Sequence, residues 1–179
     1  MLGDGGEQRP VPTRAATADD AGPLARIHVA GWQVGYRGLI PGAYLDALSV
    51  ADYERRWEEW LSGGGRTFVA EGLAGLVAFS SVGLVSDDDD AEVATGELRA
   101  LYADPAAWGT GAGKAVHDAA LAALRAAGCK QATLWALAGN TRAISFYERR
   151  GWAPDGLTKV DTSRGYAAEE IRYRIRLSP

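Results

Sequence analysis

Residues 97–114 read Glu-Leu-Arg-Ala-Leu-Tyr-Ala-Asp-Pro-Ala-Ala-Trp-Gly-Thr-Gly-Ala-Gly-Lys, and this order of residue types decides the expected fold. The first part belongs to a strand predicted over residues 92–103, which Asp104-Pro105 ends because proline cannot donate to a sheet ladder. Three glycines at alternate positions then open an alanine-rich helix predicted over residues 111–127. We therefore expect a strand, a tight glycine turn and a helix in direct succession.

The glycine turn has the chemistry of an anion-binding site. The first amides of a helix have no internal partner, the helix dipole favours negative charge there, and glycine has no Cβ atom to hold a diphosphate away. A P-loop is excluded because Trp108 and Ala115 occupy positions that it reserves for Gly and for Ser or Thr. A Rossmann turn is excluded because Lys114 stands where its third glycine belongs. The alternative without a ligand is a tight turn that only lets strand and helix pack.

Helical and strand patterns alternate along the rest of the chain. Helices are predicted after a Thr17–Asp20 capping box, over residues 50–61, and from an Asn140 cap to Arg150. Strands are predicted over residues 11–16, 131–137 and 171–177, and a hairpin of two strands over residues 66–85. Isoleucine, tyrosine and leucine alternate with arginine in the last strand, which indicates one buried face. The strands over 92–103 and 131–137 are joined through a helix, so a parallel crossover is expected between them.

The composition bounds the classes of protein to consider. The chain has 179 residues, of which 47% are hydrophobic and 23% charged, with a formal net charge of −4. This balance is typical of a globular domain, and we expect residues 1–10 to be a disordered leader and residues 11–179 to form one domain. An acidic chain lacks the basic footprint of a nucleic-acid-binding protein, and no run approaches the roughly 18 apolar residues of a membrane span.

Cysteine and histidine usage adds a few expectations. Cys129 is the single cysteine and is expected to be a small buried hydrophobe, and nothing marks the chain for export, so a cytoplasmic location is expected. No cluster has metal-ligand spacing, so no metal is expected. His28 falls on the apolar stripe of the first helix and is predicted to lie in the core with its polar atoms satisfied, whereas His117 is predicted to be exposed. The acidic run Asp87–Asp90 is interpreted as a solvated surface loop.

The stretch around the glycine turn resembles the pyrophosphate loop of the GNAT superfamily of acetyltransferases. Members carry Gln/Arg-x-x-Gly-x-Gly/Ala after a strand ending in a Leu-Tyr-x-x-Pro-like sequence. The matching residues here are Leu101-Tyr102-Ala103-Asp104-Pro105 and the turn from Trp108 through Gly111 to Gly113; Trp108 departs from the pattern, because the usual polar side chain is missing. The resemblance runs from about Val11 to Leu177 and implies an α/β fold with a mixed, mostly antiparallel sheet of six or seven strands flanked by helices on both faces.

A second and more specific likeness is the family pattern Asn-x-x-Ala-x-x-Phe-Tyr-Glu-x-x-Gly-Phe, which here reads Asn140-Thr-Arg-Ala-Ile-Ser-Phe-Tyr-Glu-Arg-Arg-Gly-Trp152. The resemblance implies that Asn140 contacts the pantetheine arm of acetyl-CoA and that Tyr147 lies near its sulfur. The acetyl-CoA would lie where the strands over 92–103 and 131–137 splay apart. The implied coenzyme site comprises Leu101, Tyr102, Ala103, Trp108, Gly109, Thr110, Gly111, Ala112, Gly113, Lys114, Asn140, Ala143, Phe146 and Tyr147.

Two residues are candidates for catalysis of acetyl transfer to a primary amine. An alkyl ammonium with a pKa of about 10.4 is almost fully protonated at neutral pH, so a base is needed. Glu97 occupies the place where several family members keep a catalytic glutamate, and Tyr147 is a candidate hydrogen-bond donor to the departing thiolate. Their alternatives are a solvent-facing glutamate at a strand end and a ring packed in the core.

The segment over residues 31–41 resembles a stretch that helps to wall the acceptor site in small-molecule members of the family. Trp32, Tyr36 and Arg37 are the candidate acceptor-binding residues, because aromatic faces suit cations and arginine suits a carboxylate. The expected acceptor is a small-molecule or peptide amine, and a homodimer is compatible with the resemblance. A non-catalytic acetyl-CoA-binding sensor or scaffold and a nucleotide-binding protein remain as alternatives.

Overall fold

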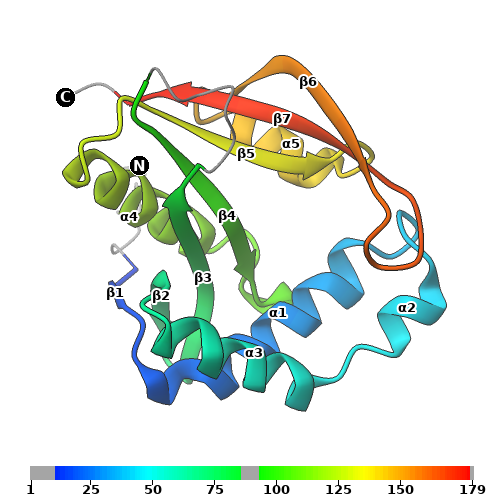
Figure 1. The fold of residues 1–179 in the computed structure, drawn as a ribbon. Coiled ribbons are helices and arrows are strands. Elements are labelled where there is room, and N and C mark those ends of the chain that lie inside the picture. The colour runs from blue at the N-terminus through cyan, green and yellow to red at the C-terminus, as the bar shows by residue number, and fades with distance from the viewer. Residues whose placement is uncertain (1–10, 86–92, 178–179) are drawn as a thin grey trace, which may run out of the picture.

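The computed structural model describes residues 11–85 and 93–177, so the expected leader and the acidic run Asp87–Asp90 lie outside the described residues. The strands are β1 (Thr13–Ala15), β2 (Arg66–Gly72), β3 (Gly75–Leu84), β4 (Thr95–Ala103), β5 (Gln131–Leu137), β6 (Ala153–Asp161) and β7 (Ala168–Arg176), and the α-helices are α1 (Ala21–Gly35), α2 (Gly42–Asp46), α3 (Val50–Ser62), α4 (Ala112–Ala126) and α5 (Thr141–Glu148) (Figure 1).

The strands form a seven-stranded sheet in the order β1-β2-β3-β4-β5-β7-β6. Every neighbouring pair is antiparallel except β4 and β5, which are parallel. The mixed, mostly antiparallel sheet and the parallel β4–β5 pair are both as predicted. The helix between those two strands, α4, ends within one residue of the predicted limits at each end.

Helices cover both faces of the sheet, as predicted, because side chains alternate along its strands (Figure 1). Val69 and Phe79 are fully buried against α1 and α3, whereas Ala70 and Ala78, their neighbours along the strands, are buried against α4. On the α4 side, Leu124 also shares a core with Tyr147 of α5. This arrangement leaves α4 and α5 on the same side of the sheet, close to the place where β4 and β5 meet.

The parallel pairing of β4 and β5 is short. Only Thr95, Gly96 and Glu97 pair with β5, whereas the pairing with β3 extends from Gly96 to Ala103. A β-bulge falls between the Val82–Leu98 and Ser81–Ala100 pairs and bends β4 at the place where it leaves β5. The backbone of Leu98–Ala103 therefore has no strand partner on the side that faces β5.

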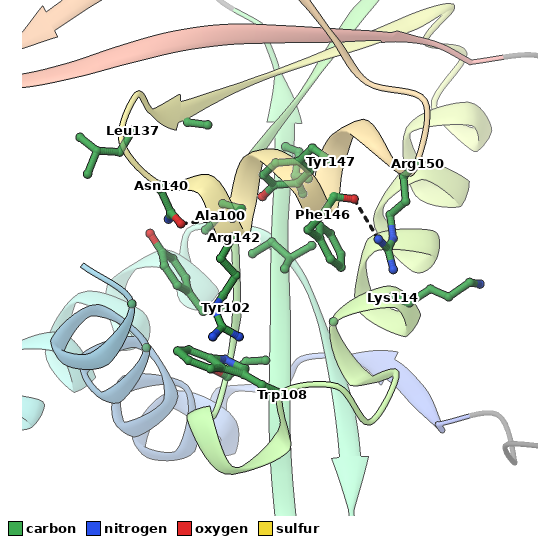
Figure 2. Close-up of a pocket in the computed structure, with 18 of the residues that line it drawn as sticks. Ala100, Tyr102, Trp108, Lys114, Leu137, Asn140, Arg142, Phe146, Tyr147 and Arg150 are labelled. Carbon is green, nitrogen blue, oxygen red and sulfur yellow. Dashed lines mark hydrogen bonds between the residues drawn. The ribbon is translucent and has the colours of Figure 1, made fainter. Parts of the chain in front are cut away.

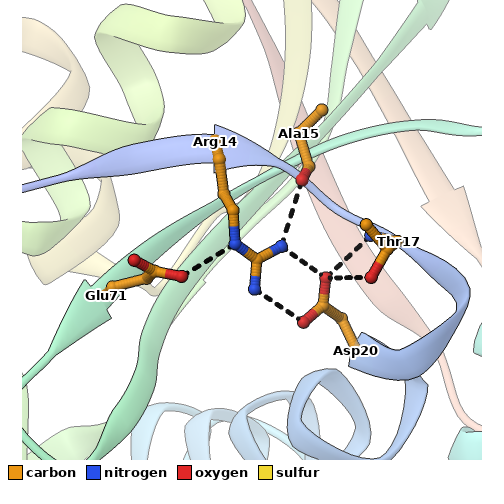
Figure 3. Close-up of polar contacts among 5 residues, drawn as sticks. All are labelled: Arg14, Ala15, Thr17, Asp20 and Glu71. Carbon is orange, nitrogen blue, oxygen red and sulfur yellow. Dashed lines mark hydrogen bonds and ion pairs between the residues drawn. The ribbon is translucent and has the colours of Figure 1, made fainter.

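A buried carboxylate ties the first strand to the first helix (Figure 3). Asp20 is 6% exposed, and its carboxylate accepts hydrogen bonds from the Arg14 guanidinium at 2.7 and 2.9 Å and from the Thr17 backbone amide at 2.7 Å. The hydrogen bonds from Arg14 hold the pKa of Asp20 below its ordinary value. Arg14 also reaches Glu71 of β2 at 2.7 Å. The capping box predicted at Thr17 is confirmed, and the ion pairs of Arg14 anchor the edge strand β1.

Two elements have no counterpart in the prediction, the strand β6 and the short helix α2. Most residues of β6 are exposed, and the strand contains Pro154 and Gly156, so it shows no apolar alternation. It is an edge strand that pairs with β7 alone. β6 forms a strand because its backbone pairs with the edge of β7. This is a tertiary contact, which the residue pattern of β6 does not predict.

Arg172 and His117 correct two expectations about burial. Arg172 was expected on the exposed face of the last strand but is 5% exposed, and its Nε donates to Asp155 of β6 at 2.7 Å. His117 was expected to be exposed but is 2% exposed. Its Nε2 accepts from the indole N–H of Trp152 at 3.0 Å, and its Nδ1 lies 3.0 Å from Asp118. Because an indole only donates, His117 is a neutral ring whose Nδ1–H donates to Asp118.

His28 packs against the core as predicted, as a half-buried residue inside an aromatic cluster, but one of its ring nitrogens has no hydrogen-bond partner among the described residues. Its ring lies 4.5 Å from that of Tyr53 and 4.7 Å from that of Tyr102, and its Nδ1 has no hydrogen-bond partner among the described residues. Burial, and then the charges of Arg164 and Arg56, lower the pKa of His28 to about 3. A histidine held in this way is neutral in the folded protein at any pH above that value.

We expect the neutral His28 to make the fold sensitive to acid. Below the ordinary histidine pKa of about 6.5, His28 is protonated in the unfolded chain but stays neutral in the folded chain. The free energy of unfolding therefore falls as pH decreases, by up to about 1.4 kcal/mol per pH unit from this residue. Urea denaturation of the wild type and of His28→Phe at pH 7, 6 and 5 measures the effect. The variant should lose less stability than the wild type on acidification, and identical pH dependence in the two proteins would contradict the assignment.

Candidate functional site

A cavity of about 570 Å³ lies where β4 and β5 diverge, between the glycine turn and α5 (Figure 2). It is bounded by the unpaired side of β4, the end of β5, the start of α4 and one face of α5. From the predicted coenzyme site, the structure brings together at this cavity Leu101, Tyr102, Ala103, Trp108, Gly109, Gly111, Gly113, Lys114, Asn140, Ala143, Phe146 and Tyr147.

Thr110 and Ala112 are the two members of that set that do not line the cavity. The hydroxyl of Thr110 turns back and donates to the backbone oxygen of Ala107 at 2.7 Å. Ala112 is 1% exposed and packs with Val116 against the sheet. Both side chains make contacts within the protein, so only the backbone groups of these two residues are candidates for contact with a ligand.

The backbone of the turn leaves amides without partners. Gly109 has φ +82° and Gly111 has φ +92°, values that favour glycine, and Gly111 is the N-cap of α4 without any side-chain cap. The first bond that closes the helix runs from the amide of Ala115 to the oxygen of Gly111 at 3.0 Å. The amides of the residues between them have no acceptor inside the helix, and α4 points this positive end at the cavity.

The charged side chains that line the cavity are all positive among the described residues. The cations that line it are Arg99, Lys114, Arg142, Arg149 and Arg150, and no carboxylate is found among its described lining residues. The whole chain carries a net charge of −4, so this positive lining is local. A cavity with cations and uncapped amides favours an anionic ligand.

Trp108 is positioned as part of the cavity wall. Its indole Nε1 donates to the backbone oxygen of Ala103 at 3.1 Å, which fixes the ring against the end of β4. The guanidinium of Arg142, from the first turn of α5, lies 3.8 Å from the centre of that ring (Figure 2). The tryptophan therefore contributes a flat surface and no free donor.

Asn140 and Tyr147 lie on the α5 side of the cavity. The Oδ1 of Asn140 accepts from the Ala143 amide at 3.1 Å and caps α5 as predicted, so its side-chain NH₂ remains available for a ligand. Tyr147 is 9% exposed, and burial raises the pKa of its hydroxyl above the ordinary value. The Tyr147 hydroxyl is therefore fully protonated at neutral pH.

A second cavity of about 240 Å³ adjoins the first one. Trp32, Tyr36 and Glu97 line it, but Arg37 does not, because its guanidinium pairs with Asp46 at 2.7 Å on an exposed part of the chain. The β6–β7 hairpin supplies residues that sequence reasoning missed, namely Lys159, Asp161, Arg164, Tyr166 and Glu170. No motif marks them, and they reach the cavity because the tip of the hairpin packs on the segment after α1, with the Tyr166 ring 5.0 Å from that of Tyr44.

The two cavities share part of their walls, which defines a junction. The residues that line both are Tyr36, Leu98, Arg99, Tyr102, Trp135 and Leu137. At this junction the hydroxyls of Tyr36 and Tyr102 are 3.2 Å apart, and burial raises the pKa of Tyr36 to about 12. Glu97 opens only on the second cavity, where it pairs with Arg99 at 3.2 Å.

None of the helices that the structure describes has the length and apolar character needed to span a membrane. Within residues 11–85 and 93–177, no group of three or more His, Cys, Asp and Glu side chains is placed to hold a metal ion.

The central sheet that splits beside an uncapped helix matches the fold of solved acetyltransferase structures. A GCN5-related N-acetyltransferase from Rhodopseudomonas palustris superposes with a TM-score of 0.77 at 23% identity, covering 99% of both chains. The PaiA N-acetyltransferase from Thermoplasma acidophilum, solved in complex with coenzyme A, gives 0.75 at 16% identity, covering 93% of this chain and 98% of that one.

Sequence comparison identifies the family. Residues 36–152 match the acetyltransferase (GNAT) family. The chain is also 30% identical over 139 residues to the uncharacterized N-acetyltransferase YuaI of Bacillus subtilis, covering 77% of this chain and 78% of that protein. The chain belongs to the GNAT family of acetyltransferases and is an acyltransferase.

Proposed function

We propose that this protein transfers the acetyl group of acetyl-CoA to a primary amine of a small molecule or peptide, by direct attack within a ternary complex. The observation that carries the proposal is the first cavity, which has cations and no carboxylate among its described lining residues and runs from the uncapped amides of α4 to the Tyr36–Tyr102 junction. The coenzyme in the structure of the Thermoplasma acidophilum relative supports the choice of donor.

Each part of acetyl-CoA has a matching group in this proposal. The diphosphate binds the amides that follow Gly111, where the helix dipole and the missing Cβ atoms favour it. The pantetheine arm follows the unpaired side of β4 in the manner of an added strand, and the free NH₂ of Asn140 donates to one of its carbonyls. The thioester then lies near Tyr147, at the junction with the second cavity.

The acceptor amine occupies the second cavity, beside Trp32 and Tyr36. Glu97 takes a proton from the ammonium, directly or through a water, and the nitrogen lone pair forms the new C–N bond at the thioester carbon. A free amide on the unpaired side of β4 stabilises the oxyanion. When the C–S bond breaks, the Tyr147 hydroxyl donates a hydrogen bond to the departing thiolate. The nitrogen loses its second proton as the amide forms, and this loss balances the proton that the thiolate takes up to leave as free coenzyme A, while Glu97 returns its own proton to solvent. Residues 11–179 act as one domain in this scheme.

Release of free thiol from acetyl-CoA on addition of a panel of amines tests the proposal. A catalytic protein gives amine-dependent release, whereas a sensor or scaffold binds acetyl-CoA without it. In the protein Glu97→Gln, kcat should fall by about 10²–10⁴ if the carboxylate is the base. The loss should shrink as pH rises toward the amine's own pKa, because free amine then needs no base.

Glu59→Gln, an exposed glutamate on α3 that lines neither cavity, is the matched control and should match the wild type. Glu97→Gln with unchanged kcat at pH 7 would remove Glu97 from the mechanism and leave acetyl transfer itself intact.

A further inference from the structure

Arg142 belongs to α5, and its guanidinium lies against Trp108, the residue that begins the glycine turn. It lies on the first turn of α5, which Asn140 caps, and its guanidinium stacks 3.8 Å above the ring of Trp108 (Figure 2). That ring is itself fixed by its hydrogen bond to the backbone oxygen of Ala103. The planar cation is thus positioned on a rigid surface, which limits the side-chain entropy that it loses on binding a ligand.

The other cations of the first cavity either form ion pairs or hydrogen bonds within the protein, or do not stack on an aromatic ring. Arg99 pairs with Glu97, and Lys114 pairs with Asp118 at 2.5 Å. Arg150 lies over Phe146 and donates to its backbone oxygen at 2.9 Å. Within the described residues, neither Arg142 nor Arg149 is paired with a carboxylate, and of these two only Arg142 stacks on an aromatic ring.

We infer that Arg142 binds the diphosphate of coenzyme A from the side opposite the amides of α4. Trp108, the residue that begins the turn, carries no charge, and its only side-chain donor is bonded to the Ala103 oxygen. Arg142 supplies the missing charge, and its five N–H groups match two phosphate oxygens at once. The inference rests on the proposed function, because it names a further residue of the same donor site.

Calorimetric titration of the whole chain at fixed salt tests this role with acetyl-CoA, acetyl-3′-dephospho-CoA and S-acetylpantetheine. Losing a charge-assisted, bidentate contact in Arg142→Ala should weaken binding of the first two ligands about 10- to 100-fold. S-acetylpantetheine, which has no phosphate, should bind wild type and variant equally. Arg142→Lys should recover part of the affinity, because it keeps the charge but loses the flat stack.

Arg55→Ala, which removes an exposed arginine of α3 outside both cavities, is the matched control and should bind as the wild type does. Unchanged affinity of Arg142→Ala for acetyl-CoA would overturn the inference. So would a loss confined to acetyl-CoA, which would assign Arg142 to the 3′-phosphate, and so would an equal loss for S-acetylpantetheine, which would mean a structural role. If the wild type binds none of the ligands, the proposed function itself fails.

Discussion

Tyr147→Phe is expected to lower kcat about 100-fold, within the range for loss of an acid–base group, and to leave KM for acetyl-CoA within about twofold. The hydroxyl interacts with the sulfur only as negative charge develops there, so its loss acts on the transition state more than on binding. Burial already keeps the hydroxyl protonated, so the kcat of the wild type should show no step from Tyr147 as pH rises through its ordinary pKa of about 10.

The control for this change is Tyr173→Phe, which removes another buried hydroxyl. Tyr173 is 3% exposed, lies on β7 and lines neither cavity, so kcat should be unchanged. Steady-state release of free thiol at saturating acetyl-CoA gives both values. Equal kcat in Tyr147→Phe and the wild type would assign Tyr147 to the core alone.

Gly111→Val is expected to weaken acetyl-CoA binding at least about 10-fold, because a β-branched residue is strongly disfavoured at a φ of +92° and the turn must relax. An added Cβ would meet nothing nearer than Val11 at 4.0 Å, so the effect comes from the backbone rather than from a clash within the protein. Relaxation turns the amides of α4 away from a common point, and the Cβ occupies space beside the diphosphate.

Gly128→Val is a closely matched control, because Gly128 follows the other end of the same helix with φ +84° and has nothing within 4 Å of an added Cβ. Each substitution should cost a similar stability, about 1–2 kcal/mol. Only the change at Gly111 should affect acetyl-CoA binding in calorimetry. Equal affinities in the two variants would show that the geometry of the turn does not matter for the coenzyme.

The parts of the fold that local residue patterns determine were predictable. The glycine turn precedes α4 as predicted, with Gly111 as the N-cap of that helix. The Asn140 cap of α5 is confirmed by the hydrogen bond that its Oδ1 accepts from the Ala143 amide. The separation of β4 and β5 followed from the family resemblance. For the turn and the cap, the signal lies within one short stretch of sequence.

The second cavity was only partly predictable, because it is assembled from segments far apart in the chain. Arg37 follows an aromatic pair in the sequence, but it pairs with Asp46 and lies outside both cavities, whereas Arg164 of the β6–β7 hairpin lines the second one. The burial of His117 likewise depends on Trp152, which lies 35 positions away. These contacts follow from tertiary packing, which overrides the local pattern.

Isothermal titration of the wild-type protein with acetyl-CoA and with coenzyme A tests most directly whether the first cavity binds the coenzyme. We predict heat of association at one site per chain for both ligands, and none for ATP or NAD at the same concentrations. Absence of any heat with either form of coenzyme A would contradict binding of the coenzyme by this protein.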